Sequence, residues 1–162
     1  MYQTIAAFLL ILVTVCNAFS IEKADRVVIL KSEKLLCLYK GEHLLSTYPV
    51  VFGGNPIGHK QQEGDKRTPE GRYILDFKKA DSAFYKAIHI SYPNEQDIKN
   101  AKKRGVHQGS SIMIHGQKNG FGWASFLSQY FNWTNGCIAL SNKNMDSVWE
   151  LVNAGTPIEI RP

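Results

Sequence analysis

A histidine and a cysteine that lie 22 residues apart are the side chains of this 162-residue chain best suited to covalent chemistry. His115 ends the apolar segment 112–114, and Cys137 opens another apolar segment, residues 138–140. A neutral imidazole can accept the proton of a thiol, and the resulting thiolate is a strong nucleophile at neutral pH. Gly136 lets the backbone approach closely, so the amides of Gly136 and Cys137 are candidates for binding an oxyanion. These residues indicate a nucleophile–base pair.

Each of these residues also has an ordinary structural interpretation. A cysteine in a strand is usually buried, and we expect this of Cys37, which lies between two leucines. Cys137 differs because a polar turn with a glycine precedes it. The residues alone leave two alternatives open. Cys137 could be a thiol of the core, and His115 could be a hydrogen-bonded residue at a strand end. We expect no disulfide between Cys37 and Cys137, because it would occupy the nucleophile.

The elements that must position this pair are mostly strands. Apolar runs bounded by turn residues predict strands, the first three as a meander, over residues 26–30, 34–39, 44–51, 72–77, 87–91, 111–115 and 157–160. The segment 53–71 is rich in glycine, proline and charged residues, which predicts a long loop. Loops of this length are often functional.

Two helices are predicted beside these strands. Residues 95–104 carry acidic side chains first and basic ones last, and Gly105 follows them. From Ser141 to near Gly155, apolar residues recur at i, i+3, i+4 and i+7, the period of an amphipathic helix. We therefore expect one mainly β domain with a few helices over residues 25–162.

The first 18 residues are predicted to be a signal peptide. Residues 1–20 contain no charged side chain, residues 5–15 are apolar, and small residues suit a cut after Ala18. Cys16 raises the alternative of a lipoprotein, but Val15 stands where a small residue normally precedes a lipidated cysteine. We therefore expect export to the periplasm or cell envelope.

Composition narrows the classes of partner. The formal net charge of +5 and the isoelectric point near 9.1 suit a polyanionic neighbour. The basic residues are scattered among acidic ones and are not interleaved with aromatic residues, so we expect no nucleic-acid partner. The cysteines lack the spacing of a zinc site, so we expect no metal.

Three motifs resemble those of L,D-transpeptidase catalytic domains of the YkuD type, over nearly all of residues 25–162. The first pairs His115-Gly116 with Thr134-Asn135-Gly136-Cys137. The second is the turn at residues 68–71 ahead of an aromatic strand, and the third is the opening hairpin, residues 34–41. The segments most similar to the YafK-like branch are residues 58–60, 89–94 and 133–140.

This resemblance implies an L,D-transpeptidase-like β-sandwich and an exported peptidoglycan enzyme. Cys137 would attack the third residue of a stem tetrapeptide, His115 would act as general base, and the carbonyl of Gly116 would orient the imidazole. The acyl group would pass to an amine, giving a 3→3 cross-link or a protein attachment. The resemblance implies no cofactor; the partners would be peptidoglycan stem peptides and, as a further candidate, an envelope lipoprotein. We expect a monomer.

Two positions depart from the commoner family pattern. Asn135 stands where many members have histidine or arginine, and Ala139 where many have arginine or asparagine. Transfer to water is therefore an alternative outcome, as a peptidoglycan hydrolase, an amidase or an L,D-carboxypeptidase. The YafK-like branch includes a hydrolase that detaches an envelope lipoprotein from peptidoglycan. A catalytically silent wall-binding module is the alternative of another class, and the intact His115, Gly136 and Cys137 speak against it.

The remaining candidates are substrate-binding residues: Asn135, Thr134, His59, His89 and Trp133. His59 and Lys60 lie in the charged loop and would contact stem-peptide carboxylates, although such loops are usually only solvated. His89 alternates with two isoleucines, so it should project from the opposite face of its strand. The aromatic segment 123–133 is either a lid over the cleft or a helix that buries Trp123, Phe126, Leu127 and Tyr130.

Overall fold

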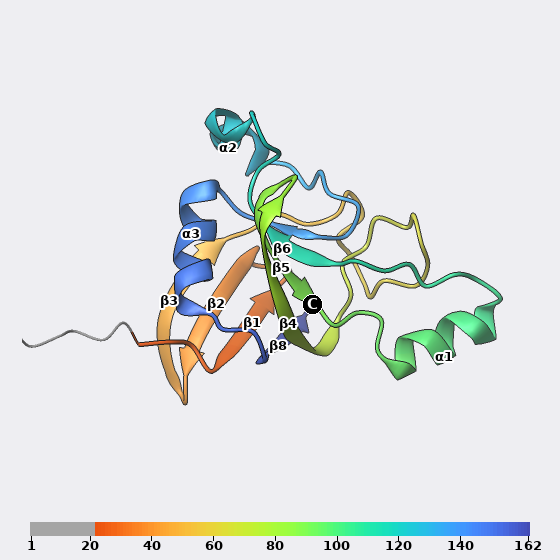
Figure 1. Cartoon of the computed structure of the whole chain (residues 1–162). Helices are drawn as coiled ribbons and strands as arrows, with labels where there is room; N and C mark the ends of the chain where they lie inside the picture. Colours follow the sequence, from red (N-terminus) through yellow and green to blue (C-terminus); the bar gives the residue numbers. More distant parts are fainter. Residues whose placement is uncertain (1–21) are drawn as a thin grey trace, which may run out of the picture.

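Eight strands and three helices make up the part of the chain that the computed structural model describes, residues 22–162 (Figure 1). The predicted signal peptide, residues 1–18, lies outside the described residues. The strands form one curled mixed sheet in the order β3-β2-β1-β8-β4-β5-β6-β7. The prediction of a mainly β domain is confirmed. Among residues 22–162, no helix has the length and apolar character that crossing a bilayer requires.

The predicted opening meander is present. β1 (Arg26–Leu30), β2 (Leu35–Lys40) and β3 (His43–Pro49) are antiparallel neighbours. The last strand, β8 (Thr156–Arg161), lies between β1 and β4 (Gly71–Ser82). It pairs parallel to β1 and antiparallel to β4. The first and last strands of the described chain therefore lie side by side in the middle of the sheet.

Side chains alternate along these strands, so one face of the sheet carries the core. Val27 and Ile29 of β1, Tyr73 and Leu75 of β4, and Ile158 of β8 all belong to one buried apolar cluster. Fully burying a leucine, isoleucine or valine side chain stabilises a fold by about 1.5–3 kcal/mol. The alternate residues of the same strands point away from this cluster.

β4 is longer than expected, because it continues past Phe77 into a twisted hairpin with β5 (Tyr85–Ile90). The pairing is irregular between Leu75 and Lys78, which lets exposed polar residues extend the strand. β5 pairs in turn with β6 (Met113–His115), which pairs in parallel with β7 (Ile138–Ala139). The segment between β3 and β4 contains no helix or strand, as predicted for residues 53–71.

The helices are α1 (Glu95–Arg104), α2 (Ser125–Ser128) and α3 (Asn142–Leu151). α1 begins with a capping box between Asn94 and Asp97 and ends at Gly105, which has the left-handed φ of +68°. α3 ends four residues before Gly155, because Val152 is extended and bridges to Ala24 instead of continuing the helix. α1 lies apart from the sheet, and α2 stands out from it at the top of Figure 1.

Candidate active site

His115 and Cys137 line the same cavity, whose volume is about 460 Å³. Three further residues predicted from the sequence line it as well, namely Thr134, Asn135 and Trp133. The cavity is completed by Ser82, Phe84, Ser111, Met113 and Lys118. The structure therefore brings five of the predicted site residues together. Their catalytic and binding roles remain predictions.

The register of the short strands β6 and β7 explains this meeting. Ile114 lies beside Ile138, and His115 beside Ala139. Residues two apart in an extended chain point to the same face, so Cys137 points to the face of Ala139 and of His115. Ile114 and Ile138 point to the opposite face and belong to the core cluster. Two apolar strands thus present the imidazole and the thiol on one side of the sheet.

The imidazole of His115 is held by its own backbone and by two aromatic rings. Its Nδ1 lies 2.6 Å from the main-chain oxygen of Gly116, so Nδ1 carries the proton and Nε2 is left as the base. The ring centroids of Phe84 and Trp133 lie 4.7 and 5.8 Å from that of His115. Burial lowers the pKa of His115, and the hydrogen bond to Gly116 opposes this only in part. The histidine is therefore a neutral imidazole at pH 7.

Cys137 is half-buried, and its thiol lies 3.7 Å from the main-chain oxygen of Ser111, within reach of a weak S–H hydrogen bond. Burial raises the pKa of Cys137; a hydrogen bond from the main chain of Met113 and the charge of Lys60 act in the opposite direction but are outweighed. The resting pair is therefore a neutral thiol beside a neutral imidazole.

The turn before Cys137 is braced by Thr134. Its hydroxyl accepts the N–H of Gly136 at 3.1 Å and donates to the carbonyl of Cys137 at 2.7 Å. The expectation that the amide of Gly136 faces an oxyanion is therefore corrected: this N–H is used inside the turn. The amide of Cys137 remains the oxyanion candidate of the two. Thr134 itself is buried, so its hydroxyl positions the nucleophile.

Gly136 is required by its surroundings. Its φ is +127°, a conformation that residues with a side chain rarely adopt. A Cβ at this position would lie 2.6 Å from the main-chain oxygen of Arg67, in the long loop. The loop between β3 and β4 therefore packs directly against the backbone that precedes Cys137.

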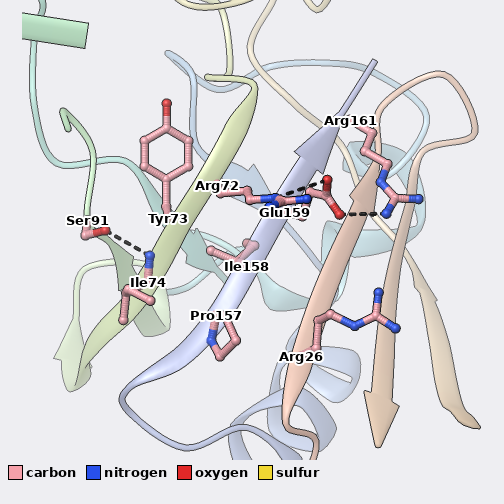
Figure 2. Close-up of a pocket in the computed structure, with 9 residues that line it drawn as sticks. All are labelled: Arg26, Arg72, Tyr73, Ile74, Ser91, Pro157, Ile158, Glu159 and Arg161. Carbon is pink, nitrogen blue, oxygen red and sulfur yellow. Dashed lines mark hydrogen bonds and ion pairs between the residues drawn. The ribbon is translucent and has the colours of Figure 1, made fainter. Parts of the chain in front are cut away.

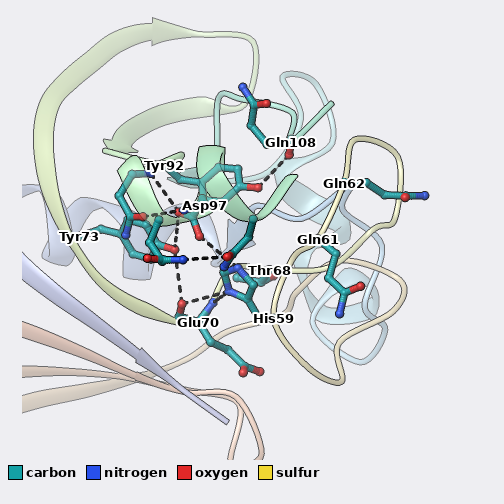
Figure 3. Close-up of polar contacts among 12 residues, drawn as sticks. His59, Gln61, Gln62, Thr68, Glu70, Tyr73, Tyr92, Asp97 and Gln108 are labelled. Atoms are coloured by element: carbon teal, nitrogen blue, oxygen red, sulfur yellow. Dashed lines mark hydrogen bonds and ion pairs between the residues drawn. The ribbon is translucent and has the colours of Figure 1, made fainter. Parts of the chain in front are cut away.

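His59 is not among the residues that line the cavity of Cys137. Its Nδ1 accepts the N–H of Glu70 at 3.0 Å, and its Nε2 lies 3.1 Å from Oδ1 of Asp97, the third residue of α1 (Figure 3). The hydroxyl of Tyr73 donates to the other carboxylate oxygen of Asp97 at 2.9 Å. His59 therefore ties the loop to α1, and its contact with substrate stays a prediction.

The hydrogen bonds of this network determine which of its groups are charged. Burial raises the pKa of Asp97, but hydrogen bonds from His59, from the N–H of Asn94 and from Tyr73 outweigh it and hold the pKa below its ordinary value. Burial and the negative charge of Asp97 raise the pKa of Tyr73. The carboxylate and the neutral phenol are therefore the stable forms at pH 7.

Lys60 is also held within the loop. Its side chain is 3% exposed, and its ammonium lies 2.8 Å from Asp65, whose carboxylate accepts N–H groups of Gln61, Gln62 and Arg67. Lys60 lines a second cavity, of about 370 Å³, which shares Asn135 with the catalytic one. Lys60 thus forms an ion pair that organises the loop beside Cys137, and its contact with substrate carboxylates stays a prediction.

His89 projects away from the core, as its alternation with Ile88 and Ile90 predicted. It does not line the catalytic cavity. Its Nδ1 lies 2.7 Å from Asp76, and its ring stacks on Phe77 with centroids 4.6 Å apart. The structure places it on β5, one strand away from His115.

The aromatic segment after β6 is mostly exposed. Exposed fractions are 73% for Trp123, 62% for Phe126 and 74% for Tyr130. The alternative of a helix that buries these side chains is therefore wrong, because only the 3₁₀ turn Gly122–Ala124 and the single turn of α2 form here. Trp133 alone of the aromatic residues in this segment lines the catalytic cavity.

Two features of the site escaped sequence reasoning. Phe84 sits at the tip of the β4–β5 hairpin, 31 residues before the histidine that it packs against, so no local pattern connects them. Ser111 has a φ of +59°, which only the coordinates reveal. Within residues 22–162 there is no cluster of three or more histidine, cysteine, aspartate or glutamate side chains that could hold a metal ion. Cys37 is buried, and both it and Cys137 are free thiols.

Known proteins are similar to this chain over most of the described residues. The family model of the YkuD L,D-transpeptidase catalytic domain matches residues 24–160. The YafK protein of Escherichia coli strain K12 is 32% identical over 130 residues, which cover 76% of this chain and 45% of that protein. The chain thus spans about half the length of the curated relatives it matches.

Solved structures show the same fold. The helical cell shape determining protein Pgp2 of Campylobacter jejuni superposes with a TM-score of 0.65 at 26% identity, covering 86% of this chain and 48% of that one. The L,D-transpeptidase of Mycobacterium smegmatis superposes with a TM-score of 0.56 at 16% identity, covering 86% of this chain and 59% of that one, which supports the fold alone. By its matched domain and its sequence identity, this chain belongs to the YkuD family of L,D-transpeptidase catalytic domains.

Proposed function

We propose that this chain is an exported peptidoglycan L,D-transpeptidase that works through an acyl-enzyme on Cys137. The single observation that carries the proposal is that His115 and Cys137 share one cavity, with Nε2 of the imidazole left as the base. Membership of the family supplies the class of substrate, a peptidoglycan stem peptide. Export to the periplasm or envelope and the signal peptide at residues 1–18 are part of the same proposal.

The first half-reaction forms a thioester. Sγ of Cys137 attacks the carbonyl carbon of the third stem residue while Nε2 of His115 accepts the thiol proton. The negative charge on the carbonyl oxygen meets the amide of Cys137. The carbon–nitrogen bond to the terminal D-alanine then breaks, and His115 returns the proton to the leaving amine. A main-chain carbonyl orients the imidazole throughout, so no carboxylate is required beside it.

The second half-reaction releases the acyl group. An acceptor amine attacks the thioester, His115 removes a proton from the nitrogen, and the sulfur leaves as a thiol after it receives that proton. With a second stem peptide as acceptor the product is a 3→3 cross-link, and with a protein amine it is an attachment to the wall.

Hydrolysis by the same site is the second candidate, and Ala139 favours it. This residue stands where many family members have arginine or asparagine, and here it is a fully buried side chain in β7. The site therefore lacks a polar group at that position to hold an acceptor. Water in place of the amine gives an L,D-carboxypeptidase or, on a peptide-bound envelope lipoprotein, an amidase.

The purified protein without residues 1–18, incubated with a disaccharide-tetrapeptide, tests the proposal. Release of D-alanine and a mass increase on Cys137 are expected, and Cys137→Ala should show neither. Cys37→Ala is the matched control, because it removes the other thiol of the domain and leaves the cavity intact. Products distinguish the outcomes, since 3→3 dimers indicate transpeptidation and tripeptide alone indicates hydrolysis. Equal product from wild type and Cys137→Ala on every substrate contradicts the catalytic assignment.

A further inference from the structure

A second concave site lies on the sheet, on the face turned away from the core cluster. It is a groove of about 490 Å³ across β1, β8 and β4 (Figure 2). Three arginines border it, Arg26 from β1, Arg161 from β8 and Arg72 from β4, with Glu159 of β8 between them. Apolar side chains that include Pro157 and Ile74 contribute to its lining.

Strand register brings these charges together. Arg72 lies opposite Glu159 across the β4–β8 pair, and Arg161 lies beside Leu30 of β1. Tyr73 and Ile158, the neighbours of Arg72 and Glu159 in sequence, point into the core, so the charged residues point outward. Arginines distant in sequence therefore border one groove because β8 enters the sheet between β1 and β4.

The guanidinium groups are held in place but retain free donors. Arg161 donates to Oε2 of Glu159 at 2.6 Å, and Nε of Arg72 lies 3.6 Å from Oε1 of the same carboxylate. Arg26 lies 4.5 Å above the ring of Tyr39 and donates to the oxygen of Gly41. Each guanidinium has five N–H groups, and its planar fork matches a carboxylate bidentately. Three positive charges against one negative charge leave the groove cationic.

The groove lies on the same sheet as the catalytic cavity, with β5 and β6 between β4 and β7. His89 lies opposite Met113 in the β5–β6 pair, and the N–H of Ile90 donates to the oxygen of Ile112 at 2.9 Å. Continuing this register puts Ser91, in the lining of the groove, opposite Ser111, in the lining of the catalytic cavity. β4, β8 and β1, which carry the arginines, are three to five strand spacings from β7, about 14–24 Å across the sheet. An extended peptide covers that distance with about four to seven residues.

We propose that this arginine groove binds carboxylate groups of the same wall polymer whose stem peptide is held at Cys137. The inference rests on the proposed function for the class of polymer. A polymer carries many identical carboxylate-bearing stems, so a second contact within reach of the first raises the effective concentration at the nucleophile. The apolar lining suits the aliphatic portions of a peptide, whereas the guanidinium groups pair with its carboxylates.

Sedimentation with purified sacculi tests the groove in the non-turning-over Cys137→Ala background. Replacement of Arg26, Arg72 and Arg161 by glutamine is expected to weaken retention at least about tenfold. The matched control replaces Lys99, Lys102 and Lys103, exposed lysines of α1, by glutamine, which removes the same charge elsewhere. This control should keep retention within about twofold of the parent. Circular dichroism of both triple variants verifies that they fold.

The test of binding by the groove gives a result independent of the test of the proposed catalytic function. Equal retention of the two triple variants contradicts binding of the wall polymer by the groove. It does so even if wild type releases D-alanine from a soluble tetrapeptide. Loss of retention in the groove variant alone supports the groove, even if no turnover is found. The same variants are also tested for binding to vesicles of anionic phospholipid, because arginine recognises lipid phosphate groups as well as carboxylates. Groove-dependent binding to vesicles but not to sacculi overturns the proposed occupant.

Discussion

The Nδ1 atom of His115 lies 2.6 Å from the main-chain oxygen of Gly116, the next residue in the chain. A histidine is thus oriented by a group that no substitution of a side chain can remove. The tautomer that leaves Nε2 free follows from this contact, and in the proposed mechanism this one ring does all the acid–base work. His115→Ala is therefore expected to lower the rate of D-alanine release by about 10²–10⁴-fold. His107→Ala, at an exposed histidine, is the control and should retain full activity; a comparable loss there contradicts the assignment.

The pH profile should distinguish a neutral pair from a preformed ion pair. Burial lowers the pKa of His115 below its ordinary 6.5, so the base is deprotonated at pH 6.5 and above, and turnover should fall only at lower pH. Burial raises the pKa of Cys137 above 9.0, so alkylation of the free enzyme by iodoacetamide should keep increasing above pH 9. An alkylation rate that levels off near pH 7 indicates a thiolate–imidazolium pair instead.

Gly136→Ala should disturb the nucleophile because of its contact with Arg67. The added Cβ would lie 2.6 Å from the oxygen of Arg67 at a φ of +127°. Strain and overpacking each cost about 1–3 kcal/mol, so we expect a loss of about 2–6 kcal/mol in the free energy of unfolding. Gly64→Ala, which also has a positive φ but no atom within 4 Å of its Cβ, should cost only about 1–2 kcal/mol. Urea unfolding measures both; equal losses contradict the packing argument.

Asp97→Asn should loosen the loop that supports the catalytic turn. Charge-assisted hydrogen bonds contribute about 1.5–3 kcal/mol each when one partner is charged, and we expect a loss of about 2 kcal/mol at pH 7. Because the pKa of Asp97 is lowered by folding, its stabilisation is present above pH 3.8 and is lost as the pH falls through the folded value. The difference from wild type should therefore vanish in acid. Glu95→Gln, in the same helical turn but exposed, is the control and should change stability by less than about 0.5 kcal/mol.

Lys60→Met should make the thiol of Cys137 less acidic. The charge of Lys60 lowers the pKa of Cys137, so its removal should slow alkylation at a fixed pH of 8.5. Asp65 keeps its three main-chain hydrogen bonds in this variant, which limits collapse of the loop. Lys66→Met, a change of the same type in the same loop, is the matched control. Equal alkylation rates in the two variants contradict an electrostatic role for Lys60.

Local chemistry made much of the fold predictable. The alternation of Ile158 and Ile160 with Glu159 and Arg161 predicts which face of β8 is buried, because the side-chain period of a strand is two. The acidic start, basic end and closing Gly105 of α1 likewise act within a few residues of the helix ends. The histidine and cysteine of the site were recognisable for the same reason: their types and their flanking glycines are local facts.

What the sequence by itself determined, then, was the strand faces, the helix caps and the histidine and cysteine of the candidate site. Only the tertiary structure decided which partner each polar side chain takes, since hydrogen bonds such as that between His59 and Asp97 join residues 38 positions apart. The arginine groove depends in the same way on β8 entering between β1 and β4, because strand order sets which distant side chains become neighbours. Charged and aromatic side chains have many possible partners along the chain, and packing selects one.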